Sequence, residues 1–327
     1  MSKQVGTLLK AGKINHEDIR YKPFDQLSPT EMDYLAKLHV ENRGGKVTTG
    51  AQLEQQKKFS EKKANQDKHH FSMQILERYE AIQENLTLQQ HGLLLYLATC
   101  MRLSKKNESG KKKGQLYDDK GERVSVALLV RQLNKSRPQL NKILSELELN
   151  GAIIRVTEGK TTYVDMTETF YVCGKLEGDY KTVKLFKAHL HEKARDLPLN
   201  TLGLFARLLT YMSWTTNLIV ENPDEQDTSE LVLLKRSHLV DLLGLSKPTV
   251  NKLMGELNRA RLIVEVKTIT DAICLDPKAV SRQAKKITFE ELLDNIEEAS
   301  LSVINFKKTK QKGCTFAEAQ PINVIAM

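Results

Sequence analysis

The sequence predicts a mainly α-helical protein with small β-hairpins, in which one unit of about 110 residues occurs twice. Residues 126–156 and 236–266 align without a gap at an offset of 110 and share 11 identities in 31 positions. Upstream, residues 86–101 match residues 197–212 at an offset of 111. A repeat of this length exceeds the unit of a solenoid and fits two copies of one small domain.

The first copy is expected to open with two helices. Four apolar residues recur at helical spacing and predict an amphipathic first helix: Leu93, Leu94, Leu97 and Met101. A second helix is expected over about residues 124–133, and its inward side carries Val126, Leu129, Val130 and Leu133. The polar pair Asn134-Lys135 then predicts a tight turn.

A third helix and a hairpin complete the copy. Ser136 can cap the helix, Pro138 suits its first turn, and Gln139 stands where the partner of a capping box belongs. After Gly151, two β-rich stretches flank Glu158-Gly159-Lys160, which predicts a hairpin. Helix, helix, turn, helix and hairpin is the order of a winged helix-turn-helix domain. The predicted fold is therefore a tandem duplication of this domain.

The exposed side of the third helix in each copy predicts contact with double-stranded DNA. A recognition helix enters the major groove N-terminus first, and there arginine suits guanine while asparagine or glutamine suits adenine. The alternative is that these residues form only the solvated faces of two core-forming helices. The candidate DNA-binding residues are Arg137, Gln139, Asn141 and Lys142 in the first copy, Lys160 in its hairpin, and Lys247, Thr249, Asn251 and Lys252 in the second copy.

The loops inside the two copies differ in charge. The first loop carries Lys111, Lys112 and Lys113, which join the DNA-binding candidates, whereas residues 221–230 of the second loop include five acidic side chains. The contrast suggests that the first domain binds DNA more strongly, while the second binds it weakly or contacts a protein. The formal net charge of +9 is consistent with a polyanionic partner.

The sequence carries none of the common signatures of catalysis. It has no phosphate-binding loop of the Walker type, no HExxH and no GxSxG motif, so we expect neither an enzyme nor a cofactor. The histidine pairs His69-His70 and His189/His191 have no further ligands at suitable spacing, and no metal site is expected. Scattered cysteines and the absence of a long apolar run predict a soluble, reduced, cytoplasmic protein without a membrane partner.

We expect five parts along the chain. They are a basic, partly disordered N-terminal arm (1–70), a first winged-helix domain (71–172), a basic helical linker (173–196), a second winged-helix domain (197–280), and a C-terminal helix with a loose tail (281–327). Capping boxes from Ser28 to Glu31 and from Thr288 to Glu291 predict where two of the helices begin. The C-terminal helix is expected to pack on the second domain, with pairing of two protomers as the alternative.

Residues 94–159 resemble the winged-helix segment of replication initiators from plasmids and mobile elements of Gram-positive bacteria. The resemblance rests on the opening motif YLATCM, the loop LSKKN, the turn YDDKG and the recognition helix LNKILSEL. Residues 163–175 are similar to the segment after the wing in the RepL-type group, and MarR-like regulators share the same outline. The resemblance implies origin binding, with each recognition helix in a successive major groove and Arg137, Gln139, Asn141 and Lys142 at recognition positions.

Three functions fit these observations. The first is a plasmid or phage replication initiator that binds origin repeats in double-stranded DNA and recruits host replication machinery. The second is a transcriptional regulator or repressor of a phage or plasmid, which would act on host transcription machinery. The third is a non-catalytic assembly or partition protein. Two unlike recognition helices in one chain favour a long or asymmetric site read by a monomer, and hence the first function; a symmetric homodimer is the alternative.

Overall fold

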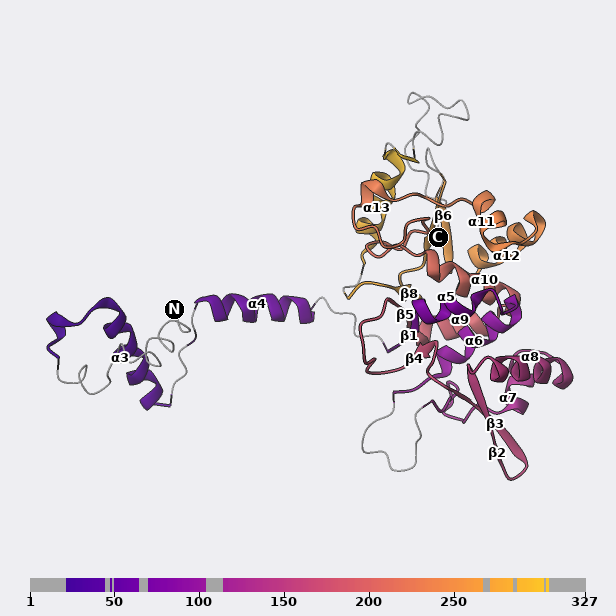
Figure 1. Ribbon diagram of the computed structural model, residues 1–327, viewed down its shortest axis with the longest axis horizontal. Helices are drawn as coiled ribbons and strands as arrows, with labels where there is room; N and C mark the ends of the chain where they lie inside the picture. Colours follow the sequence, from indigo (N-terminus) through magenta and orange to yellow (C-terminus); the bar gives the residue numbers. More distant parts are fainter. Residues whose placement is uncertain are drawn as a thin grey trace. The chain divides into compact units, whose positions relative to one another are not determined.

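The computed structural model describes residues 22–44, 48, 50–64, 70–103, 114–266, 271–284, 287–302 and 304–305. These residues form a mainly α-helical structure with small antiparallel sheets, which confirms the predicted fold class at this level (Figure 1). The chain divides into two compact units, an N-terminal unit (Met1–Gln66) and a C-terminal unit (Asp67–Met327).

The N-terminal unit contains η1 (Phe24–Gln26), α3 (Pro29–Asn42) and α4 (Gly50–Ala64). The predicted capping box at the start of α3 is confirmed, because the Ser28 backbone N–H donates to the Glu31 carboxylate at 2.8 Å and the Glu31 N–H donates to Ser28 Oγ at 3.4 Å. In α4, residues 52–60 are all exposed, as its lack of an apolar stripe predicts.

In the C-terminal unit, residues 71–172 (the first half) and residues 182–281 (the second half) pass through the same order of elements. The first half contains β1 (Phe71–Ile75), α5 (Leu76–Gln83), α6 (Leu88–Cys100), α7 (Val126–Gln132), α8 (Arg137–Leu149), β2 (Ile153–Glu158), β3 (Thr161–Met166) and β4 (Tyr171–Val172). The second half contains β5 (Thr182–Phe186), α9 (Lys187–Arg195), α10 (Leu199–Leu208), α11 (Arg236–Leu243), α12 (Lys247–Arg259), β6 (Ile263–Val266), β7 (Ala272–Leu275) and β8 (Val280–Ser281). Two short 3-10 helices, η2 (Leu209–Tyr211) and η3 (Thr228–Glu230), lie between α10 and α11, and α13 (Phe289–Leu301) follows.

The segment 173–196, expected to be a basic helical linker, instead begins its regular structure with strand β5 before helix α9. Val183 and Leu185 are fully buried and alternate with the partly exposed Thr182 and Lys184. Such alternation of buried and exposed side chains is typical of a strand that packs one face against a core. Strand β5 pairs with β1 in the middle of the sheet. The segment therefore contributes to the core.

The four-stranded sheet joins the two halves in the order β4-β1-β5-β8. Strands β1 and β5 are antiparallel, with Met73 opposite Lys184 in the middle of the five paired residues. On the outer side of β1, Met73 also faces Val172 of β4, and on the outer side of β5, Lys184 also faces Ser281 of β8. The sheet thus has the same pairing on either side of its centre.

Helices α6 and α10 pack against each other next to this sheet, at a distance that only glycine permits. A Cβ atom on Gly92 would lie 1.9 Å from the carbonyl oxygen of Leu199, and a Cβ atom on Gly203 would lie 1.9 Å from that of Leu88. Both helices are almost completely buried in the larger hydrophobic core, which extends through both halves. The helix pair therefore fixes the two halves to each other through backbone contact.

A smaller core lies behind the β6–β7 hairpin. Helix α13 begins at the predicted Thr288 capping box and buries Leu292, Ile296 and Ala299 against this hairpin and the 218–233 segment. The prediction that the C-terminal helix packs on the second half is confirmed.

Four buried polar side chains distinguish the first half from the second. Gln74 is fully buried, and neither atom of its amide has a hydrogen-bond partner among the described residues. The hydroxyl of Tyr79 lies 2.5 Å from His91 Nδ1. The four polar residues of the first half lie in β1, α5, α6 and β4 and are, in this order, Gln74, Tyr79, His91 and Tyr171. The corresponding positions of the second half, in β5, α9, α10 and β8, hold Leu185, Leu190, Leu202 and Val280. The first half therefore carries a polar cluster where the second has an aliphatic core.

Gly92→Ala and Gly203→Ala should each destabilise the protein, because the added methyl group would displace a backbone carbonyl rather than a flexible side chain. We expect the free energy of unfolding to fall by about 1–3 kcal/mol or more in chemical denaturation. Gly255→Ala in α12 is the matched control: nothing lies within 4 Å of its added Cβ, so the substitution should raise stability by up to about 1 kcal/mol. Equal effects at all three positions would contradict the close helix crossing.

His91 should make stability depend on pH. Burial lowers its pKa to about 4, although the ring Nε2 also donates to the Gln83 carbonyl at 2.9 Å. The neutral ring is therefore preferred in the folded state, and the stability that this preference contributes is present above the unfolded pKa of about 6.5 and lost as pH falls toward 4. The loss should approach about 3 kcal/mol. His91→Leu introduces the residue that stands at the corresponding position of the second half. Chemical denaturation should show that the free energy of unfolding of this variant falls by about 3 kcal/mol less than that of the wild type over this pH interval. The same pH dependence in both proteins would refute the assignment.

Candidate nucleic-acid interface

Helix α8 presents the predicted recognition residues of the first half. Ser136 caps the helix by accepting the Gln139 backbone N–H at 3.4 Å, and the opposite side of the helix buries Leu140, Ile143, Leu144 and Leu147. This burial sets the rotation of the helix, so that Arg137, Gln139 and Lys142 are exposed and Asn141 is partly exposed. The structure thus places the four residues on the outer side of one helix, within its first two turns.

Helix α12 has the same construction. Ser246 caps it by accepting the Thr249 backbone N–H at 3.4 Å, and Val250, Leu253, Met254 and Leu257 are buried. Lys247, Asn251 and Lys252 are exposed, whereas Thr249 is partly exposed and its hydroxyl lies 2.7 Å from Ser246 Oγ. Of the predicted residues, Thr249 is the one whose hydroxyl is already engaged within the helix cap.

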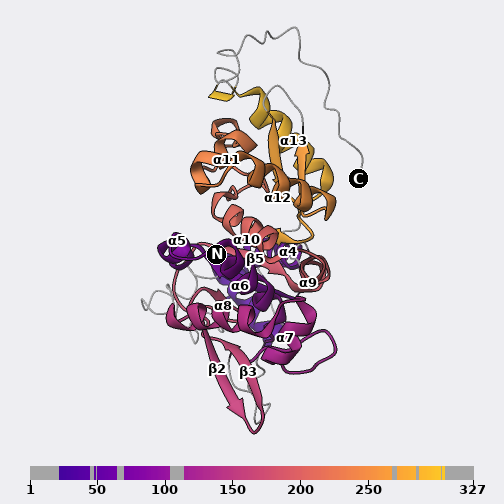
Figure 2. The ribbon, with the colours of Figure 1, turned by 90° about the vertical axis from the view of Figure 1, so that its right-hand side faces the viewer.

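The two helices lie on the same side of the C-terminal unit. In Figure 1, α8 and α12 both occupy the right-hand side, and Figure 2 shows them after that side has been turned toward the viewer, with α6 and α10 between them. The β2–β3 hairpin projects beyond α8, and Lys160 is exposed at its tip beside Gly159, whose φ of +61° favours glycine.

A carboxylate ties each of α8 and α12 to a central helix. Glu146 of α8 accepts a hydrogen bond from the Gln90 side chain of α6, and Glu256 of α12 accepts one from the Thr201 hydroxyl of α10. The helices that precede them are tied as well, because the Tyr96 hydroxyl donates to Gln132 at 2.9 Å and the Arg207 guanidinium donates to the Leu243 carbonyl at 3.0 Å. Both helix-turn-helix pairs are therefore held on α6 and α10.

Several arginines near the two helices already have carboxylate partners. Arg155 lies 2.6 Å from Glu148, Arg123 contacts both Glu158 and Asp165, and Arg236 pairs with Glu265. By contrast, among the residues that the structure describes, no ion pair involves Arg137, Lys142, Lys160, Lys247 or Lys252. Their charges are available to an anion.

Two further cations, which were not predicted from the sequence, lie beside α8. Arg131 is exposed in the last turn of α7 and Lys135 is partly exposed in the turn before Ser136, and neither has a carboxylate partner within the described part of the chain. The signal that could have identified them is their position at the polar turn: Arg131 lies just before it and Lys135 within it. Lys111, Lys112 and Lys113 lie outside the described residues.

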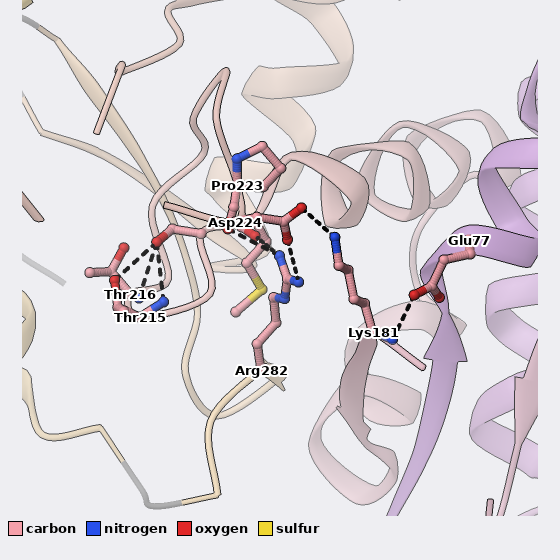
Figure 3. Close-up of polar contacts among 9 residues, drawn as sticks. Glu77, Lys181, Thr215, Thr216, Pro223, Asp224 and Arg282 are labelled. Carbon is pink, nitrogen blue, oxygen red and sulfur yellow. Dashed lines mark hydrogen bonds and ion pairs between the residues drawn. The ribbon is translucent and has the colours of Figure 1, made fainter. Parts of the chain in front are cut away.

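One acidic side chain in the loop of the second half, Asp224, forms ion pairs with two cations of the same unit. Asp224 lies 2.6 Å from the Lys181 ammonium and 3.2 Å from the Arg282 guanidinium (Figure 3). Partial burial opposes ionisation of Asp224, but these two hydrogen bonds hold its pKa below the usual range. Arg282 also donates to the Met212 carbonyl at 2.7 Å, and its side chain is fully buried. The Asp224 side chain stays 53% exposed, but these two cations offset its charge.

The described residues contain no group of three or more histidine, cysteine or acidic side chains that could hold a metal ion. Cys100, Cys173 and Cys274 are buried free thiols, and burial raises the pKa of each. Within the described part of the chain, no helix has the length and apolar character needed to cross a bilayer.

No family model matches the chain, and comparisons with curated proteins and with solved structures found no match.

Proposed function

We propose that the protein is a sequence-specific double-stranded DNA-binding protein whose two halves are tandem duplicated winged helix-turn-helix domains. The observation that carries the proposal is the pair α8 and α12, which share a serine cap and present cations without carboxylate partners on one side of the unit. Uncommitted cations and amides at the start of an exposed helix are the groups that contact phosphates and base edges.

The two helices offer different base-reading groups. In the first half, Arg137 suits a guanine and Gln139 or Asn141 suits an adenine, while Lys142 suits a phosphate. In the second half, Thr249 replaces the glutamine and has its hydroxyl bonded to the cap, so fewer specific contacts are available. The first half is therefore proposed to supply more of the specificity, with Lys160 at the hairpin tip as an additional phosphate contact.

Among DNA-binding functions, a plasmid or phage replication initiator is favoured over a transcriptional regulator. A single chain with two unlike recognition helices can bind as a monomer, whereas a regulator commonly uses one such domain in a symmetric homodimer. In this proposal the protein acts in the cytoplasm with host replication machinery as a further partner. A regulator contacting transcription machinery is the second candidate, supported by the same helices.

Selection of bound fragments from the DNA of the source element, followed by footprinting, separates these functions. A cluster of repeated sites beside an AT-rich stretch would support an initiator. A single site across a promoter would support a regulator. If no fragment is preferred over bulk DNA, the sequence-specific function is wrong, and an assembly or partition role without sequence reading becomes the better account.

Arg137→Ala should weaken binding to the selected site by about 1–3 kcal/mol and relax the preference at one base pair. Arg155→Ala is the matched control, because Arg155 is already paired with Glu148. Competition binding with single-base variants of the site measures both effects. Equal losses for the two variants, or no change in base preference for Arg137→Ala, would remove Arg137 from the recognition surface.

Lys142→Ala should weaken binding to all sequences alike and lower the slope of log affinity against log salt concentration by about 1, because it removes one phosphate contact. Lys278→Ala removes the same charge from the exposed turn between β7 and β8 and should leave the slope unchanged. Replacing Lys111, Lys112 and Lys113 together should lower the slope further if that loop contacts DNA. A slope that is equal in wild type and Lys142→Ala would exclude the phosphate contact.

A further inference from the structure

We propose that one chain reads an imperfect inverted repeat, with α8 on one half-site and α12 on the other at a fixed spacing. The inference rests on the proposed DNA-binding function and adds the arrangement of the DNA site. It concerns the relative direction of the two recognition helices, which neither helix reveals by itself.

The central sheet supplies the first part of the argument. An antiparallel strand pair has a local two-fold axis through its middle residue pair, here Met73 and Lys184. The same axis relates the outer strands, because Met73 pairs with Val172 on one side and Lys184 pairs with Ser281 on the other. Strands β4 and β8 thus extend the two-fold relation across the whole sheet.

The helix crossing follows the same relation. Gly92 approaches the Leu199 carbonyl and Gly203 approaches the Leu88 carbonyl, each with 1.9 Å from the ideal Cβ position to the oxygen. The two contacts exchange under the offset of 111 residues that also relates Met73 to Lys184. The axis therefore passes through the sheet and between α6 and α10.

The relation continues to the recognition helices. Glu146 ties α8 to Gln90 of α6, and Glu256 ties α12 to Thr201 of α10. Since α6 and α10 are two-fold related and hold their recognition helices through equivalent residues, α8 and α12 are related by the same axis. Both lie on the α6/α10 side of the sheet, where the axis emerges (Figure 2).

Two recognition helices that are related by a two-fold axis and lie on one side of a protein fit a duplex only when that axis coincides with a two-fold axis of the DNA. The two half-sites are then inverted. A direct repeat would require the recognition helices to be related by translation, which the antiparallel β1–β5 pair forbids. Because backbone contact fixes the halves, the spacing between half-sites is fixed too.

The exposed residues define how the two half-sites differ. Asn141 and Lys142 of α8 match Asn251 and Lys252 of α12, so the base pair read by asparagine should be the same in both half-sites. Arg137 and Gln139 correspond to Lys247 and Thr249, so the base pairs read there should differ. The repeat is therefore imperfect at identifiable positions.

The test is selection of sites from a random-sequence duplex library by the full chain, with a symmetrised variant beside the wild type. Lys247→Arg combined with Thr249→Gln gives α12 the side chains of α8 at the two positions outside the core that differ within the first turn. Wild type should select an imperfect inverted repeat, and the double variant should select one with identical half-sites. Lys278→Arg combined with Thr228→Gln, outside both helices, should select the wild-type site.

Spacing and stoichiometry complete the experiment. Inserting five base pairs between the half-sites should reduce affinity about tenfold or more, because one half-site is lost from the face of the duplex that the protein contacts. The mass of the complex should correspond to one chain per inverted repeat. Selection of direct repeats, tolerance of the insertion, or two chains per repeat would overturn the inference while leaving DNA binding intact. Selection of no sequence at all would overturn the proposed function as well.

Discussion

The close approach of α6 and α10 is the constraint on which the C-terminal unit depends. At Gly92 and Gly203 the two helices meet backbone to backbone, and no side chain is available to adjust the contact. The paired strands β1 and β5 lie beside this crossing and allow one register. Since α8 and α12 are bonded to these same central helices, the geometry of the surface that we assign to DNA follows from two glycines and one strand pair.

The two halves also differ in their buried cores. The first half buries a polar cluster around Gln74 and His91, whereas the second is aliphatic at the same places. The backs of their hairpins also differ. Gln115 and Arg123 lie beside β3 in the first half, while Leu218 and Leu233 form an apolar surface in the second, which α13 covers. The two halves therefore differ in how they are packed and covered, and α13 packs on the second half.

Local features of the fold could be predicted from the sequence, and long-range ones could not. The caps at Ser28, Ser136 and Thr288 are set by residues three positions apart, and each begins the expected helix. The pairing of β1 with β5 joins residues 107 to 115 positions apart, and the short runs FSMQI and TVKLF give no sign of their partners. The same limit applied to the candidate site: its exposed residues could be named, but not the pairing of Arg123 with Asp165, which lies 42 positions away.

Residues 126–156 and 236–266 share identical side chains at 11 positions. Most of them have a structural role: the shared leucines, Val130 and Ile153 pack in the larger core, Ser136 and Pro138 begin a helix, and Glu146 ties it to α6. Asn141 and Lys142 have no such role. Among the described residues, neither they nor Asn251 and Lys252 form an ion pair or side-chain hydrogen bond within the chain, and both lysines are exposed. In the proposed function, these two shared side chains contact the DNA.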